Sequence, residues 1–226
     1  MNEAAAKPAG DLILYGHPFS SYTWKVLIAL YADENPFEFR IVDPDHPEHA
    51  EVVRQAGPLA KFPVLATGDN LLFESTTIIE YLSKYHPGQN MLVPHDPDAA
   101  IGMRMLDRVF DNYVMEPTQR IVNEYIRNAD APDEQRIAEA KADLDKSYAW
   151  LEGWLEYYPP ADHISLIECA AAPALFYSDW VHPIGDEHPR LRYWRAHLLA
   201  HPAVAQCVED AKPWRQYFPP GAPDRD

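Results

Sequence analysis

Short apolar runs dominate the hydrophobic pattern of the first 86 residues. Residues 12–15, 62–65 and 71–73 are apolar runs of strand length, and residues 37–41 alternate large apolar with charged side chains. Both patterns predict strands. A short polar segment containing Gly68 separates the second run from the third, which favours a hairpin between them.

Helical patterns lie between and after these strands. Ser20 or Ser21 is placed to cap a helix whose apolar positions share one side: Val26, Leu27, Leu30 and Tyr31. Because this helix joins two strands within about thirty residues, we expect a crossover unit with parallel strands. Residues 47–56 can form a short helix, and Ser75 is the predicted N-cap of a helix after the hairpin.

The periodicity from residue 98 onward is helical throughout. One long helix is predicted through residues 101–113, with Pro117 as a kink, and another begins at 131–133. Ser165-Leu-Ile-Glu168 matches a capping box ahead of a helix of small residues. Two more helices are predicted at 190–199 and 202–210.

These patterns divide the chain of 226 residues into two parts, a length that is comfortable for two domains. Residues 11–86 predict a thioredoxin-like α/β domain with a mixed four-stranded sheet, and residues 98–219 predict an all-helical bundle domain. Residues 87–97 are rich in proline and polar side chains and are the expected linker. Residues 1–10 lack the apolar core of a signal peptide and are expected to form a loose tail.

The charge balance limits the possible partners. A formal net charge of −16 argues against nucleic acid and anionic membranes, because phosphate binding requires clustered Lys and Arg. No apolar run approaches the ~18–20 residues of a membrane helix. The 2 cysteines, Cys169 and Cys207, are too few for a disulfide framework or a four-cysteine metal site. We therefore expect a cytoplasmic protein without a metal.

Four segments together resemble the glutathione transferase family over roughly residues 11–215. Residues 14–26 (Leu-Tyr-Gly-His-Pro-Phe-Ser-Ser-Tyr-Thr-Trp-Lys-Val) resemble the first strand and active-site loop of the serine-type classes phi and zeta. Residues 57–65 resemble the family segment whose second proline is cis, and residues 73–82 resemble its glutamate-serine motif. Residues 165–176 resemble the helix start in the core of its second domain.

The sequence departs from the family pattern at four positions. Gly57 and Ala60 stand where the family usually has Asn and Gly, and Phe62 replaces a small β-branched residue. Glu168 stands where the capping residue is usually Asp. Each replacement keeps the general chemistry of its segment.

The resemblance implies a glutathione site on the first domain. Glu74 would pair with the γ-glutamyl ammonium, and Ser75 would bind the γ-glutamyl carboxylate at a helix N-terminus. A cis bond at Phe62-Pro63 would present the Phe62 backbone to the cysteinyl peptide as an added strand. Lys61 could reach the glycyl carboxylate, assisted by His49, although a plain surface histidine is an equally good interpretation of His49.

Ser20 matches the catalytic serine of the phi class and the first serine of the zeta pair, with Ser21 as the alternative. Its hydroxyl would donate to the glutathione sulfur, and a hydrogen bond to a charged group contributes about 1.5–3 kcal/mol. That energy lowers the pKa of the thiol by about 1–2. The thiolate, not the serine, is then the nucleophile. Tyr22 is a weaker candidate, because the tyrosine-type classes place theirs earlier.

The resemblance also favours glutathione conjugation over thiol transfer. The thiol-transfer members need a cysteine in the first-helix loop, and residues 16–26 contain none. Cys169 is expected to be buried and inert, and His17 to be structural. An electrophile would bind between the domains against the long helix, where these residues lie: Met103, Asp107, Phe110, Asn112 and Tyr113.

The sequence therefore predicts a homodimeric, serine-type glutathione transferase with glutathione as co-substrate and an apolar electrophile as the second substrate. One alternative is a non-catalytic member that binds glutathione or another protein. Another is a glutathione-dependent isomerase of the zeta kind, which needs a basic acceptor pocket that the acidic composition does not support.

Overall fold

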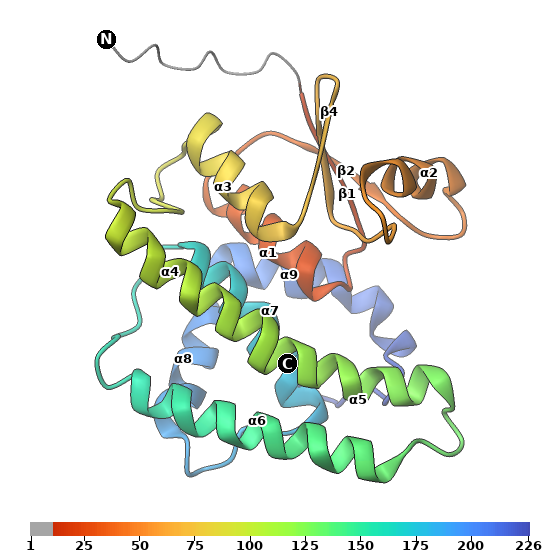
Figure 1. Ribbon diagram of the computed structural model, residues 1–226, viewed down its shortest axis with the longest axis vertical. Helices are drawn as coiled ribbons and strands as arrows, with labels where there is room; N and C mark the ends of the chain where they lie inside the picture. The colour runs from red at the N-terminus through yellow and green to blue at the C-terminus, as the bar shows by residue number, and fades with distance from the viewer. Residues whose placement is uncertain (1–10) are drawn as a thin grey trace.

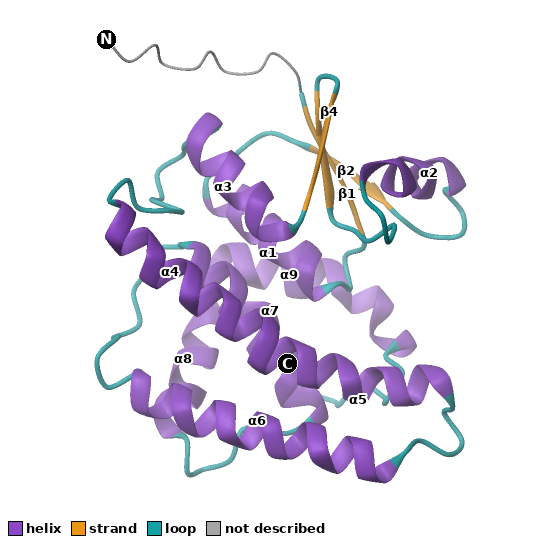
Figure 2. Cartoon of the chain, viewed as in Figure 1, coloured by secondary structure: helices purple, strands orange, loops and turns teal. Residues whose placement is uncertain are grey.

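The computed structural model describes residues 11–226, so the expected N-terminal tail lies outside the described residues. Strands are confined to one end of the molecule, and helices build the rest (Figures 1 and 2). No helix of the described chain is both long and apolar enough to cross a membrane.

The sheet has four strands in the order β2-β1-β3-β4. They are β1 (Leu12–Gly16), β2 (Glu38–Ile41), β3 (Val64–Thr67) and β4 (Asn70–Phe73). Strand β1 pairs in parallel with β2 and antiparallel with β3, and β3 and β4 form the expected hairpin. The mixed sheet is thus confirmed. The strand β3 begins two residues later than its apolar run, so that Phe62 and Pro63 precede it.

Side-chain alternation along the strands buries both faces of the sheet. Leu14 and Leu65 face the helices α1 (Ser21–Ala32) and α3 (Ser75–Tyr85). Tyr15 and Val64 face α2 (Pro47–Ala56), which lies on the other side (Figure 1). Three helices against a mixed sheet give the predicted thioredoxin-like arrangement.

The predicted cap of α3 is wrong by one residue. Glu74 occupies the N-cap position with φ 68°, and Ser75 is the first residue of the helix. The Glu74 side chain makes no capping hydrogen bond. At α1 the expectation is confirmed for Ser20, whose hydroxyl accepts from the Thr23 N–H at 3.3 Å.

The second part of the chain is helical, as predicted. Its elements are α4 (Pro97–Val109), the π-helical segment η1 (Phe110–Met115), α5 (Glu116–Arg127), α6 (Glu134–Trp154), α7 (Leu166–Val181), α8 (Pro189–Ala200), α9 (Pro202–Ala211) and the 3-10 segment η2 (Lys212–Tyr217). The irregularity expected at Pro117 takes the form of the wider π turn before it. Proline has no N–H to donate to the Tyr113 carbonyl, which instead accepts from Ser147 Oγ at 2.6 Å.

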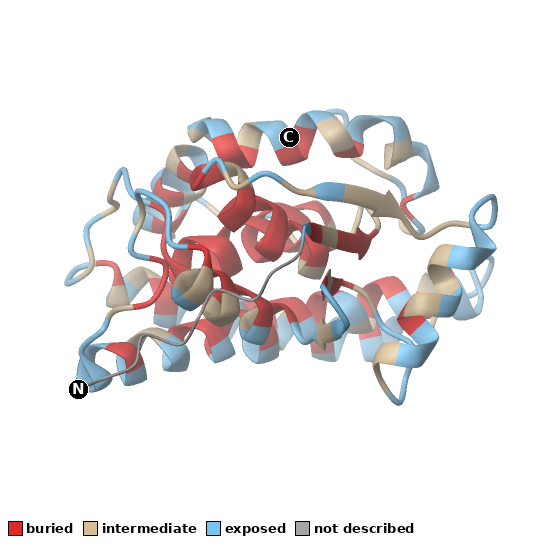
Figure 3. Ribbon diagram, turned by 90° about the horizontal axis from the view of Figure 1, so that it is seen from above, coloured by how far each residue is buried: buried red, intermediate tan, exposed pale blue. Residues whose placement is uncertain are grey.

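Helix α7 is buried along almost its whole length. Figure 3 shows that buried residues gather in the middle of the molecule. The predicted capping box is present: Ile167 N–H donates to Ser165 Oγ at 3.2 Å, and Ser165 N–H donates to Glu168 at 3.0 Å. Helix α1 packs on α7 through Trp24, whose ring lies 4.9 Å from that of Phe176. This contact joins the sheet part to the helical part. The linker at 87–97 and the domain limits beside it stay a prediction.

Candidate functional site

Two adjoining cavities lie where the two parts of the chain meet. The first, here called the polar cavity, has a volume of about 290 Å³ and is lined by Tyr22, Gly57, Pro58, Leu59, Lys61, Phe62, Pro63, Phe73, Glu74, Ser75, Arg108, Asp111 and Asn112. The second, here called the apolar cavity, has a volume of about 270 Å³ and is lined by Phe19, Ser20, Ser21, Tyr22, Phe62, Met115, Gln119, Val122, Ile126, Tyr177, Tyr217, Phe218 and Pro219. Tyr22 and Phe62 line both.

The polar cavity brings together five of the residues predicted for the binding site: Lys61, Phe62, Pro63, Glu74 and Ser75. The peptide bond between Phe62 and Pro63 is cis, as expected. His49 lies elsewhere. Its Nδ1 is 2.7 Å from the Ile41 carbonyl, its ring lies against Tyr15, and it lines neither cavity. The structure therefore does not place His49 with the other predicted residues.

Glu74 and Ser75 lie where β4 turns into α3. A φ of 68° is uncommon outside glycine, and residues held in this region are frequent at ligand sites. Glu74 is exposed, and among the described residues it has no ion-pair partner. Ser75 is buried in the first turn, where backbone N–H groups lack helical acceptors. This turn can therefore hold a cationic group of a ligand at Glu74 and an anionic group at the first turn of α3.

A buried charge cluster that the sequence did not predict lies behind the polar cavity. The Lys25 side chain is only 2% exposed, and its Nζ lies 2.7 Å from Asp107 and 2.8 Å from Asp111. Arg108 Nη2 lies 2.7 Å from Asp111 and 2.5 Å from Thr76 Oγ1. Asp107, expected along the acceptor site, is fully buried in this cluster instead. Two features of the sequence could have indicated this cluster: a lysine inside the apolar run of α1, and two aspartates four residues apart on one side of a predicted helix.

The loop that carries Ser20 is held by short-range contacts. Gly16 lies so close to α1 that a Cβ there would be 2.6 Å from the Thr23 side chain. His17 Nδ1 accepts from the Phe19 N–H at 3.1 Å, and the Trp214 ring lies 4.5 Å from the His17 ring. Burial lowers the pKa of His17, although Asp43 acts in the opposite direction. A neutral, structural His17 agrees with the expectation from sequence.

Ser20 and Ser21 both line the apolar cavity, but they differ in their bonding. Ser20 Oγ accepts from Thr23, so its own O–H is available to donate to a ligand. Ser21 is the more deeply buried of the two, at 8% exposure. Tyr22 lies between the cavities. Burial, with a contribution from Asp111, raises the pKa of Tyr22 to about 12, so its phenol is neutral at physiological pH.

The wall of the apolar cavity differs from the one expected. Of the five residues named for an electrophile, none lines it: Asn112 lines the polar cavity, Phe110 is fully buried, and Tyr113 is 60% exposed. The wall comes instead from one side of η1 and α5 and from the C-terminal segment. Four residues on one side of η1 and α5 contribute to this wall, and they lie four, three and four positions apart. This helical spacing can be seen in the sequence: Met115, Gln119, Val122 and Ile126.

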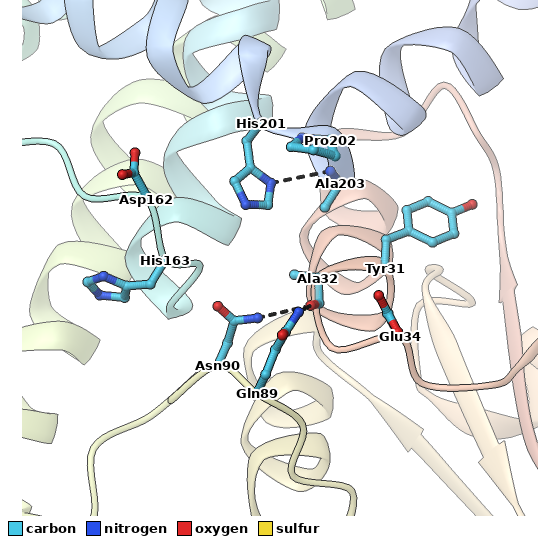
Figure 4. A pocket seen from close by; sticks show the side chains of 10 residues that line it. All are labelled: Tyr31, Ala32, Glu34, Gln89, Asn90, Asp162, His163, His201, Pro202 and Ala203. Atoms are coloured by element: carbon cyan, nitrogen blue, oxygen red, sulfur yellow. Dashed lines mark hydrogen bonds between the residues drawn. The ribbon is translucent and has the colours of Figure 1, made fainter.

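A further polar groove, of about 640 Å³, opens between the end of α1, residues 89–90 and the start of α9 (Figure 4). None of its lining residues is a predicted site residue. Asn90 Nδ2 donates to the Ala32 carbonyl at 2.9 Å, and His201 Nδ1 accepts from Ala203 N–H at 3.2 Å. The first bond joins the segment after α3 to the end of α1, and the second caps the start of α9.

The groups in residues 11–226 that could bind a metal ion or act as a thiol nucleophile are His, Cys, Asp and Glu side chains. No group of three or more His, Cys, Asp or Glu side chains in this range could hold a metal ion. Cys169 and Cys207 are both unpaired and buried, and burial raises the pKa of each thiol well above its usual value. A buried protonated thiol is a poor nucleophile.

The fold and the cavities define a class: a thioredoxin-like domain joined to a helical domain, with two adjoining cavities where they meet. Residues 14–90 match the family model for the glutathione S-transferase N-terminal domain. Glutathione S-transferase 1 of Dianthus caryophyllus is 31% identical over 172 residues, which cover 73% of this chain and 76% of that protein. The chain therefore belongs to the glutathione S-transferase family, and the predicted glutathione transferase fold and enzyme class are confirmed.

Other relatives extend the match to nearly the whole chain. A probable maleylacetoacetate isomerase of Vibrio cholerae is 27% identical over 212 residues, covering 90% of this chain and 98% of that protein. The crystal structure of a glutathione S-transferase from Methylobacterium radiotolerans in complex with glutathione sulfonate superposes with a TM-score of 0.71 at 25% identity. That match covers 96% of this chain and 98% of the other.

Proposed function

We propose that this protein binds glutathione in the polar cavity and stabilises its thiolate through the Ser20 hydroxyl, for attack on an electrophile in the apolar cavity. One observation supports this proposal most. The cavity that contains Glu74, Ser75 and Phe62 opens directly beside the cavity that contains Ser20, and the two share Tyr22 and Phe62. A tripeptide in the first would extend its central residue toward the second.

Each part of glutathione has a counterpart in the polar cavity. The exposed Glu74 carboxylate suits an ammonium group, and the first turn of α3 at Ser75 suits a carboxylate. The Phe62 backbone, directly ahead of β3, can pair with the cysteinyl peptide, and Lys61 can pair with the glycyl carboxylate. The Methylobacterium relative, which binds glutathione sulfonate, supports the same choice of ligand.

Catalysis in this proposal depends on a hydrogen-bond donor, the Ser20 hydroxyl, beside the glutathione sulfur, on which negative charge develops. A free Ser20 O–H at the N-terminus of α1 stabilises the thiolate more than the thiol, and the helix dipole acts in the same direction. The serine remains a hydrogen-bond donor throughout. The neutral Tyr22 phenol lies beside the same cavity, but we assign no proton transfer to it.

The apolar cavity favours conjugation over isomerisation. The residues described as its lining include no Lys, Arg or His, so it offers no cation to an anionic acceptor. Its aromatic and aliphatic wall suits an apolar electrophile of small size. An isomerase of the zeta kind, which needs a basic acceptor pocket, is therefore the less favoured alternative.

We further propose a cytoplasmic homodimer. Two buried, unpaired cysteines fit a reducing compartment. Exposed apolar side chains on α4, η1 and α6 fit a subunit interface: Ile101, Met105, Tyr113 and Trp150.

The test compares Ser20→Ala with Ser21→Ala in the conjugation of a model aryl halide, with glutathione affinity measured by calorimetry. We expect Ser20→Ala to lower kcat by about tenfold to a hundredfold, because one hydrogen bond to a charged group is lost. The pKa of bound glutathione, followed by thiolate absorbance, should rise by about 1–2. Glutathione affinity should change little. Full activity in Ser20→Ala would transfer the role to Ser21, and a wild type that does not bind glutathione would overturn the proposal.

A further inference from the structure

We propose that Arg108 binds the α-carboxylate at the γ-glutamyl end of glutathione, so that the pair Glu74 and Arg108 recognises the amino-acid zwitterion. The inference rests on the proposed function, and it assigns a role to a residue of α4 that lies outside the motifs of the first domain.

Arg108 lies at the edge of the polar cavity with part of its guanidinium unoccupied. Its Nε and Nη2 face the protein: Nε lies 3.1 Å from Asp107, and Nη2 bonds Asp107, Asp111 and Thr76. Within residues 11–226, Nη1 has no hydrogen-bond partner. The side chain is 48% exposed and lines the same cavity as Glu74 and Ser75. Two N–H donors are therefore available to a ligand.

The buried cluster holds this guanidinium in place and uses only its Nε and Nη2, which leaves Nη1 to a ligand. Lys25 lies within 2.7–2.9 Å of both aspartates, so these two carboxylates already have a cation of their own. Two positive and two negative groups leave the cluster neutral with Arg108 included, and Glu74 adds one unpaired negative charge beside it. The contact from Arg108 to Thr76 also fixes the guanidinium relative to Ser75, the preceding residue.

This arrangement matches one chemical group in particular. The γ-glutamyl end of glutathione has an ammonium and a carboxylate on the same carbon, and the cavity offers a free carboxylate and a partly free guanidinium. A guanidinium binds a carboxylate with strong, directional hydrogen bonds. Lys61, the other cation of the cavity, adjoins Phe62 and suits the glycyl carboxylate at the opposite end of the tripeptide.

The test uses two ligands that differ by this carboxylate alone. Calorimetry compares glutathione with 4-aminobutyryl-cysteinyl-glycine, which keeps the ammonium and lacks the γ-glutamyl carboxylate. We expect the wild type to prefer glutathione by about tenfold to a hundredfold. Arg108→Met should reduce this preference several-fold and leave the part that the first turn of α3 at Ser75 provides, whereas Arg108→Lys should stay closer to the wild type.

Arg104→Met is the matched control, because Arg104 lies one turn earlier on α4, is similarly exposed, and pairs with Glu80 at 2.5 Å. It should keep the wild-type preference. An Arg108→Met variant that loses affinity equally for both ligands would overturn the proposal, since that result indicates a structural role. A wild type that binds both ligands equally would overturn it without any variant. A wild type that binds neither would overturn the proposed function as well.

Discussion

The polar and the apolar cavity adjoin at Tyr22 and Phe62, yet they are assembled in different ways. Most of the polar wall comes from one continuous stretch, residues 57–75, and α4 and η1 complete it. The apolar wall combines residues 19–22, one side of residues 115–126 and the C-terminal residues 217–219, with Phe62 and Tyr177 between them in sequence. The first is local in sequence, and the second depends on how the helical part packs against the sheet part.

This difference has a functional meaning. A ligand that contacts a strand, a helix start and a turn of one compact domain meets a constant geometry. An acceptor site built from a helix side and a terminal segment can change with a few substitutions, without disturbing the first site. The two cavities should therefore respond independently to mutation. The charge cluster behind the polar cavity should be the exception, because it joins α1 to α4.

The largest effect is expected from Lys25→Met. Removing this cation leaves Asp107 and Asp111 buried with only Arg108 as a partner, and breaking a buried ion pair costs about 3–5 kcal/mol. The measurement is the free energy of unfolding from urea titration. Arg104→Met, which breaks an exposed pair, should cost at most about 1 kcal/mol. A similar small value for Lys25→Met would show that the cluster does not stabilise the junction of the two parts.

A smaller and more selective effect is expected from Val122→Phe. Val122 lines the apolar cavity from α5, and a ring at this position fills space that the electrophile would use. Because even one methylene in such a pocket changes discrimination about tenfold or more, we expect KM for a model aryl halide to rise about tenfold. Steady-state rates at saturating glutathione provide the measurement, and calorimetry should give an unchanged affinity for glutathione.

The counterpart in the polar cavity is Glu74→Gln, which should weaken glutathione binding and leave KM for the aryl halide unchanged. Equal losses of both affinities in either variant would contradict the independence of the cavities.

The fold could be predicted from sequence wherever a local pattern dictates the structure. The capping box at Ser165, the short helix from Pro47 and the hairpin around Gly68 depend on neighbouring residues, and all three are present. The cap at Ser75 could not be predicted correctly, because Glu74 adopts a positive φ that its residue type does not indicate. The π-helical segment was not predicted either. A proline indicates that the helix is irregular nearby, but it does not indicate whether the irregularity is a kink or a π turn.

The same distinction holds for the site. Lys61, Glu74 and Ser75 were predicted because each lies within a short local motif, at 57–65 or 73–82, and the structure places all three in one cavity. Lys25 and Arg108 were missed, because a contact between α1 and α4 joins residues more than eighty positions apart. His49 was predicted with two alternatives, and the structure places it against Ile41 and outside both cavities, because proximity in sequence to the binding segment does not specify which side of α2 a residue occupies.

The smallest predicted effect concerns pH and the loop of Ser20. His17 Nδ1 accepts from Phe19 N–H, so this nitrogen must be unprotonated, and burial lowers the pKa of His17 below its ordinary value of 6.5. The unfolded chain therefore takes up the proton first as the pH falls. The contribution of His17 to stability is present above about pH 6.5 and is lost as the pH falls through the lower pKa of the folded state.

We expect the urea midpoint of the wild type to fall more steeply between about pH 7 and 5 than that of His17→Asn, whose amide oxygen can accept the same bond without titrating. The difference in unfolding free energy should grow as the pH falls through this range and stay smaller than the effect of Lys25→Met. Because the loop belongs to the apolar cavity, conjugation should lose activity with this titration while glutathione affinity follows the titration less closely. Parallel pH profiles of stability for the wild type and His17→Asn would show that His17 does not cause the pH dependence. A loss of glutathione affinity equal to the loss of activity would show that this loop supports both cavities.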